Sequence, residues 1–151
     1  MAQTTGLING SNLRVMLAED GSSPVMVDNI TDCSISVSTE MKDTSVKEDG
    51  GLKASLPGRV SASVNFTAYF EEGATTGYVQ IMPLQLAGTK LDCKFTQILG
   101  TATSPAVDSN DHAFTFEAYV TSCELSGGVE DTSTYSCTLE VVGAITYAAI
   151  S

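Results

Sequence analysis

The chain has 151 residues, enough for one compact domain whose core needs no metal or disulfide, and we expect a single domain over residues 1–151. It carries 18 acidic and 7 basic residues, which gives a formal net charge of −11. A surface this acidic argues against proteins that grip nucleic acid or anionic membranes, because both are bound through clustered Lys and Arg.

The N-terminus lacks the basic start and apolar block of a secretion signal, and no apolar run approaches the length of a bilayer span. We therefore expect synthesis in a cytoplasm as a soluble protein.

Apolar and polar residues alternate with a period of two along most of the chain, which predicts a mainly β fold. Residues 12–19 and 24–29 flank the turn residues 20–23 and predict a hairpin. In the next predicted strand, apolar residues alternate with serines: Cys33, Ile35 and Val37 with Ser34, Ser36 and Ser38.

Segment 40–59 differs from its surroundings because it is rich in charge and glycine and has no apolar phase. Its four basic and four acidic residues cancel, so the remainder of the chain keeps the whole net charge of −11. We expect a long loop without its own secondary structure. Such a loop is either a flexible hairpin tip or an arm that becomes ordered against a neighbouring subunit.

Residues 60–70 give the longest clean alternation, with one apolar face and one face of small polar groups. A helix is predicted over residues 75–87, with Thr75 or Thr76 as its cap and Gly88 after its end. Its apolar stripe would be Tyr78, Ile81, Met82 and Leu86. Pro83 should kink or shorten this helix, because proline lacks the N–H and its ring clashes with the preceding turn.

After this helix the sequence predicts a strand over residues 90–98, a polar loop over 100–111, and two long strands over 113–125 and about 134–142. In the first of these, Phe114, Phe116, Ala118 and Val120 share one phase, whereas Cys123 and Leu125 have the opposite phase. A β-bulge near Thr121 and Ser122 reconciles the two phases. Residues 141–150 form an apolar tail that would make a poor free end.

Groups that could support catalysis or bind a metal are scarce, and we expect no enzyme, metal or cofactor. His112 is the only histidine, and we expect it in a solvated turn of the polar loop. The four cysteines are far apart and contain no CxxC pair, so we interpret them as reduced, buried small hydrophobes. No GxSxG, P-loop, HExxH or GxGxxG pattern occurs.

The positive signal is a polar face that recurs on four predicted strands and contains hydroxyls and carboxylates but no Lys or Arg. An ordinary sandwich whose outer face meets water would also be polar, but it usually carries both signs of charge. A channel for a polyanion should offer no cation to phosphate. The residues that we assign to this face are Ser34, Ser36, Ser61, Ser63, Thr115, Glu117, Thr138 and Glu140.

The order of these features resembles the tail tube (major tail) proteins of long-tailed bacteriophages. A Ser/Thr-rich strand enters a charged loop, passes Leu56, Pro57 and Gly58, and returns as the alternating strand. The C-terminal part, a strand, a short acidic turn at Glu130 and Asp131, and a strand reaching Gly143, is also similar to that family.

The resemblance implies a structural virion protein: a β-sandwich or barrel subunit with one flanking helix that forms hexameric rings. The sheets would join into one inner barrel, and stacked rings would form the tail tube through which DNA passes without specific binding. The implied partners are other copies of the chain and, at the tube ends, the tape measure, terminator and distal tail proteins. The loop 40–59 would contact the adjacent ring through Lys42, Asp43, Lys47, Glu48, Asp49, Lys53, Leu56, Pro57 and Gly58.

The alternative from a different class is a monomeric immunoglobulin-like adhesion or decoration module. It accounts for the β pattern and the acidity. It accounts neither for the long loop 40–59, whose positive and negative charges cancel, nor for the apolar C-terminal residues.

Overall fold

The computed structural model describes residues 13–47, 50, 53–97 and 112–149. Within them lie seven strands and one helix: β1 (Leu13–Glu19), β2 (Val25–Met26), β3 (Ile30–Asp43), β4 (Ser55–Tyr69), α1 (Tyr78–Ala87), β5 (Leu91–Gln97), β6 (His112–Ser126) and β7 (Thr134–Ala149). The strands form one antiparallel sheet in the order β2-β1-β5-β6-β7-β4-β3. The predicted mainly β fold with one helix is confirmed.

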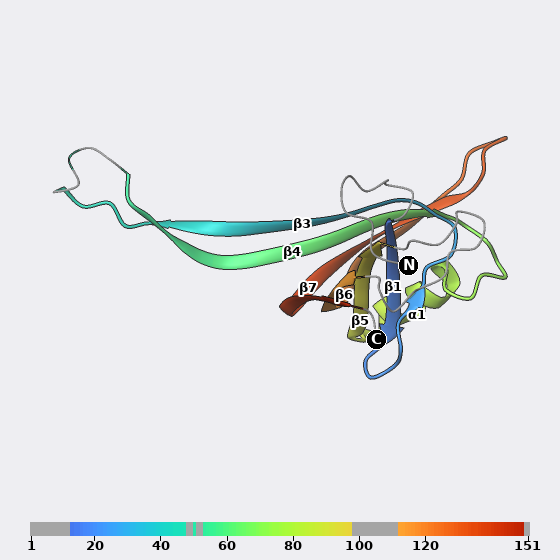
Figure 1. Cartoon of the computed structure of the whole chain (residues 1–151). Helices are drawn as coiled ribbons and strands as arrows, with labels where there is room; N and C mark the ends of the chain where they lie inside the picture. The colour runs from blue at the N-terminus through green and yellow to red at the C-terminus, as the bar shows by residue number, and fades with distance from the viewer. Residues whose placement is uncertain (1–12, 48–49, 51–52, 98–111, 150–151) are drawn as a thin grey trace.

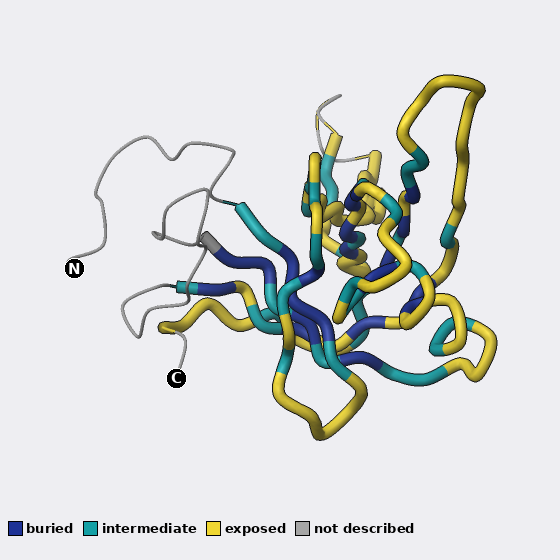
Figure 2. Tube along the Cα trace, turned by 90° about the vertical axis from the view of Figure 1, so that its right-hand side faces the viewer, coloured by how far each residue is buried: buried dark blue, intermediate teal, exposed yellow. Residues whose placement is uncertain are grey.

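The apolar faces of the strands meet in one core, because the sheet curls so that β1 and β5 cross the direction of β3 and β4 (Figure 1). Val64 lies opposite Leu139, and Phe66 lies opposite Cys137, on the neighbouring strands β4 and β7. All four side chains are buried. Burial of each large apolar side chain contributes about 1.5–3 kcal/mol, and Figure 2 shows these buried stretches gathered at the centre of the molecule.

The predicted N-terminal hairpin is confirmed, since Leu17 of β1 pairs with Val25 of β2. On its other side β1 pairs with β5 along its whole length. This arrangement buries Val15 and Leu17 in the core.

Helix α1 begins later than predicted, at Tyr78, with Gly77 in place of a threonine as the N-cap residue. The Oε1 atom of Gln80 accepts a hydrogen bond from the Gly77 N–H at 3.0 Å. As predicted, Gly88 ends the helix, in the left-handed conformation with φ 66°. The helix continues through Pro83 to Ala87, so Pro83 does not end it early. Pro83 lies on the exposed side, where water can hydrate the carbonyl that lacks a donor.

The predicted apolar stripe of the helix is wrong at two positions. Tyr78 packs against the core and Ile81 is buried, but Met82 and Leu86 are exposed. Leu84 completes the packed side instead. Apolar residues occur on almost every side of this short helix, so their spacing did not single out the buried side.

The predicted β-bulge in β6 is confirmed. Val120 pairs with Leu139 and Ser122 with Thr138, so that Thr121 is the extra residue. The hydroxyl of Thr121 donates a hydrogen bond to the Thr138 carbonyl at 3.1 Å. The bulge turns Cys123 towards the core despite its opposite phase.

Strand β7 continues beyond the predicted end at residue 142 and reaches Ala149. Thr115 pairs with Thr146 while Glu117 pairs with Val142, so Phe116 faces three residues of β7. Gly143 stands at this irregularity with φ 78°, a conformation that favours glycine. The apolar tail is therefore a bent strand paired with the start of β6.

Segment 40–59 is not the predicted loop without secondary structure. Strand β3 runs to Asp43 and β4 starts at Ser55, and these two residues pair. We call this projecting hairpin, residues 38–61, the arm; it extends well beyond the rest of the molecule (Figure 1). The sequence shows no apolar phase here because residues 38–47 of the arm are exposed on both faces.

Candidate functional site

The polar residues predicted to share a face come together on β3, β4 and β7. Residues directly opposite each other in a sheet point to the same side, and Ser36 pairs with Ser63, while Ser63 also pairs with Glu140. Ser34 pairs with Asn65, which in turn pairs with Thr138. The two sets form one surface opposite the core. We call it the serine face: Ser34, Ser36, Ser38, Ser61, Ser63, Asn65, Thr138 and Glu140.

Hydrogen bonds link side chains of the serine face across neighbouring strands. The hydroxyls of Ser36 and Ser63 lie 3.0 Å apart, as do those of Ser38 and Ser61. Thr138 donates to the Asn65 side-chain oxygen at 2.8 Å. Each pair of serine hydroxyls shares one hydrogen bond, and apart from Asn65 and Glu140 the face consists of short side chains.

Glu140 is the carboxylate of the serine face, and it lines a shallow hollow with serines of β3 and β4. Within the described residues, no Lys, Arg or His nitrogen lies within 4.0 Å of Glu140. Its negative charge is therefore not neutralised by a neighbouring side chain.

Thr115 and Glu117 lie apart from the serine face, beside β5. Asp92 pairs with Glu117, and Lys94 pairs with Thr115. The interpretation that these polar strand faces carry no Lys or Arg is therefore wrong here. Lys94 was missed because the alternation was read strand by strand, while the sheet order that joins β5 to β6 was unknown.

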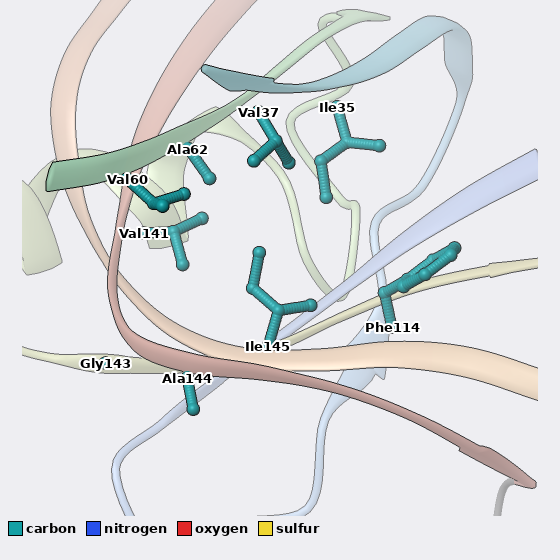
Figure 3. Close-up of a pocket in the computed structure, with 9 residues that line it drawn as sticks. All are labelled: Ile35, Val37, Val60, Ala62, Phe114, Val141, Gly143, Ala144 and Ile145. Carbon is teal, nitrogen blue, oxygen red and sulfur yellow. The ribbon is translucent and has the colours of Figure 1, made fainter. Parts of the chain in front are cut away.

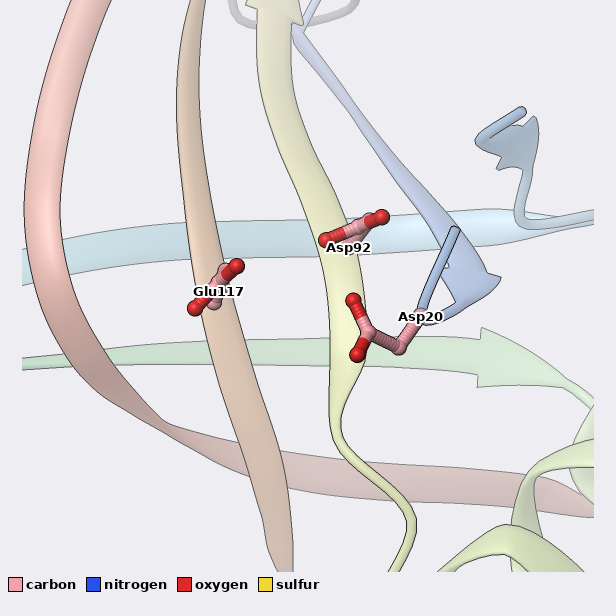
Figure 4. A group of neighbouring side chains, drawn as sticks. All are labelled: Asp20, Asp92 and Glu117. Atoms are coloured by element: carbon pink, nitrogen blue, oxygen red, sulfur yellow. The ribbon is translucent and has the colours of Figure 1, made fainter. Parts of the chain in front are cut away.

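Glu117 belongs to an acidic cluster with Asp20 and Asp92, in which one carboxylate oxygen of each residue lies within 4.8 Å of the other two (Figure 4). Lys90 lies against this cluster, with its Nζ atom 3.3 Å from Glu117 and 3.4 Å from Asp20. The hydrogen bond to Glu117, together with the charge of Asp20, raises the pKa of Lys90. The cluster thus has an internal cation, and Glu117 does not present an unpaired charge as Glu140 does.

The residues predicted to contact a neighbouring ring lie on the arm. Lys42 and Asp43 are in β3, while Leu56, Pro57 and Gly58 are in β4. Lys47 and Lys53 flank the tip, and Glu48 and Asp49 lie outside the described residues. The arm thus gathers these charges at one end of the molecule, away from the core (Figure 1).

An apolar hollow at the root of the arm was not predicted. It has a volume of about 540 Å³ and lies between the arm and the bend of β7 (Figure 3). Only apolar side chains and Gly143 line it: Ile35, Val37, Val60, Ala62, Phe114, Val141, Gly143, Ala144 and Ile145. The sequence signal was present in the apolar phases of β3 and β4 next to the arm, where Ile35 and Val37 face Val60 and Ala62.

The four cysteines are free thiols, as predicted, although only Cys93 and Cys137 are fully buried. Burial raises the pKa of Cys93 to about 12. His112 lies in β6 and not in a turn, and its ring stacks on Tyr147 at a centroid distance of 5.4 Å. In the described part of the chain, no contact is seen between one of these thiols and the His112 ring that would pair a nucleophile with a base.

Comparison with known protein families identifies the kind of protein to which this geometry belongs. The family model described as phage tail tube protein matches residues 9–147. The chain belongs to this phage tail tube protein family. It is accordingly a structural subunit of a tail tube and a component of a phage tail or related particle.

Solved structures of tail tubes have the same fold as this tail tube subunit. The tail of an empty gene transfer agent particle, solved with C6 symmetry, matches with a TM-score of 0.75 and 21% identity over 95% of this chain and 100% of that chain. The SPP1 tail tube matches with a TM-score of 0.73 and 18% identity over 95% of this chain and 80% of that chain.

A contractile injection system is also similar. The sheath–tube complex of such a system, in its extended state, matches with a TM-score of 0.61 and 15% identity over 97% of this chain and 94% of that chain. A search of curated proteins found no match. Among the described residues, the single helix is too short to cross a membrane.

Proposed function

We propose that six copies of the chain form a ring, that rings stack into the tail tube, and that the serine face lines the channel through which DNA passes. The assembly has no enzymatic role, and the subunit is made in the cytoplasm of a bacterial host before it enters the virion tail. The tape measure, terminator and distal tail proteins contact the ends of this tube.

The observation that carries this proposal is the serine face itself. Four of its serine hydroxyls are hydrogen-bonded in pairs, and within the described residues no basic side chain lies within 4.0 Å of Glu140. Such a surface gives the DNA backbone no cation to bind, so the duplex can slide without forming salt bridges. A face that only met water would have no need to exclude Lys and Arg.

The free edge of β3 supports ring formation. β3 is the terminal strand of the sheet and is 14 residues long, so among the described strands one side of its backbone has no partner. Long exposed edges pair readily with other strands. Joining β3 to the opposite edge of a neighbouring copy would satisfy these groups and extend the serine face around a closed barrel.

The test is microscopy of the purified protein together with light scattering over a wide concentration range. We expect rings that stack into hollow tubes as concentration rises. A monomer at every concentration would overturn the proposal and restore the monomeric adhesion module as the better interpretation.

A further inference from the structure

We propose that the turn between β6 and β7 of one copy inserts Val129 into the apolar hollow of a copy in the next ring. This inference rests on the proposed tube, and it identifies the side chains that join one ring to another. The proposed occupant of the hollow is thus a side chain from a second copy of this chain and not a small molecule.

The hollow needs an apolar occupant. Val37 and Val60 on its wall are 58% and 59% exposed, and Phe114 is 40% exposed. Figure 3 shows the side chains of Val60, Val37 and Ile145 around one common space. Apolar surface that gathers in one place and is rimmed by polar residues marks an interaction site, unlike single exposed apolar residues.

Val129 is a matching projection. Its side chain is 97% exposed, the highest value among the exposed large hydrophobic residues of the described chain. It stands in the turn that joins β6 to β7, and Glu130, with φ 65°, follows it. An apolar residue held out on a constrained turn loses little freedom when it binds, which favours a contact with a preformed hollow.

The arm and the turn that carries Val129 project from opposite sides of the subunit. In Figure 1 the arm extends to the left, and the β6–β7 turn, in orange, projects at the upper right. Strands of a closed barrel run along its axis with a tilt, so the two ends of each strand face the two adjacent rings. Head-to-tail stacking therefore brings the turn of one copy to the arm root of the next.

The charges do not oppose this pairing. The turn carries Glu130 and Asp131 and no basic residue, whereas the four basic and four acidic residues of the arm cancel. The acidic turn of one copy would therefore meet a neutral arm and not a second acidic surface.

Val129→Asp tests the contact. A carboxylate cannot enter an apolar hollow without losing its hydration, so we expect intact rings whose concentration threshold for stacking rises at least about tenfold. Val60→Asp, on the wall of the hollow, should have the same effect. The control Val79→Asp changes an exposed valine on α1 and should leave stacking at the wild-type threshold.

Photo-cross-linking gives a second measurement that does not depend on how the variants fold. With a benzophenone amino acid at position 129, assembled tubes should yield a covalent dimer whose link maps to residues of the hollow. A link elsewhere, a link within one chain to residues 1–12 or 98–111, or normal stacking of Val129→Asp overturns the inference. Wild-type protein that forms no tubes at all would instead overturn the proposed tube.

Discussion

Tyr135 is a buried side chain whose hydroxyl oxygen finds no hydrogen-bond partner in the described part of the chain. Its ring packs edge-on against Phe66 at a centroid distance of 6.3 Å and against Tyr78 at 5.8 Å. Burial also raises the pKa of the Tyr135 hydroxyl, so it stays protonated. The ring contributes packing, while the oxygen carries a desolvation cost.

We therefore predict that Tyr135→Phe stabilises the subunit by about 1 kcal/mol, because it removes an unsatisfied polar atom and keeps the ring. Thermal unfolding followed by circular dichroism measures the change. The control Tyr69→Phe removes a hydroxyl from an exposed ring and should leave the melting temperature unchanged. A lower melting temperature for Tyr135→Phe would mean that the hydroxyl is bound in the folded protein.

Residue patterns predicted structure wherever one face of a strand is buried. The phase change after Val120 located the bulge at Thr121, because only an extra residue could return Cys123 to the core. The serine face was predicted for the same reason, since burying Val64 and Leu139 forces Ser63 and Glu140 to the other side. Glu117 was assigned to the strand face that points away from the core. Its ion-pair partner Lys90 precedes β5, and no sequence pattern indicates that β5 lies beside β6.

At the scale of elements, the arm and the end of β7 show why other segments were not predicted. The arm is a two-stranded ribbon without a buried face, so no alternation records its pairing. At Gly143, a single residue of β6 opposes three of β7, and the period of two is lost although the strand continues. Both segments depend on tertiary pairing more than on local pattern.

The arm should be dispensable for folding and necessary for stacking. We predict that replacing residues 43–56 with a short Gly/Ser bridge leaves the melting temperature within a few degrees, because loop length changes closure free energy by only about 0.6 kcal/mol per doubling. Rings should form but not stack, as judged by negative-stain microscopy.

The matched control keeps the arm at full length and replaces residues 44–54 with Gly and Ser. If the basic and apolar groups of the arm make the contact, this control also fails to stack. Long tubes from the shortened protein would show that the arm is only a flexible tip.

At the scale of the whole molecule, acidity is distributed unevenly in a way that suits a tube. The arm carries no net charge, so the net charge of −11 lies on the remainder of the chain, which includes the serine face. Neutral arms can lie against neighbouring rings with little repulsion, while the channel surface remains negative. The proposed ring would repeat Glu140 by symmetry and so convert one carboxylate into a band of negative charge.

The last prediction tests that band directly. Glu140→Lys should fold normally, because residue 140 is exposed and lies among small hydroxyls, and assembled tubes should then retain duplex DNA. Each phosphate bound by lysine releases a counter-ion, so the logarithm of the binding constant should fall by about 0.9 per contact for each tenfold rise in salt. Retention of labelled DNA by tubes across a salt series measures this slope.

The control Glu72→Lys makes the same change of charge at an exposed position outside the sheet. Tubes with this substitution should retain no more DNA than wild-type tubes do. Glu117→Lys should have a smaller effect than Glu140→Lys, because the carboxylates of Asp20 and Asp92 lie beside residue 117 and would offset the new positive charge. Equal retention by the Glu140→Lys and Glu72→Lys tubes at low salt would place the serine face outside the channel, since only a cation inside the lumen can meet a duplex that threads it.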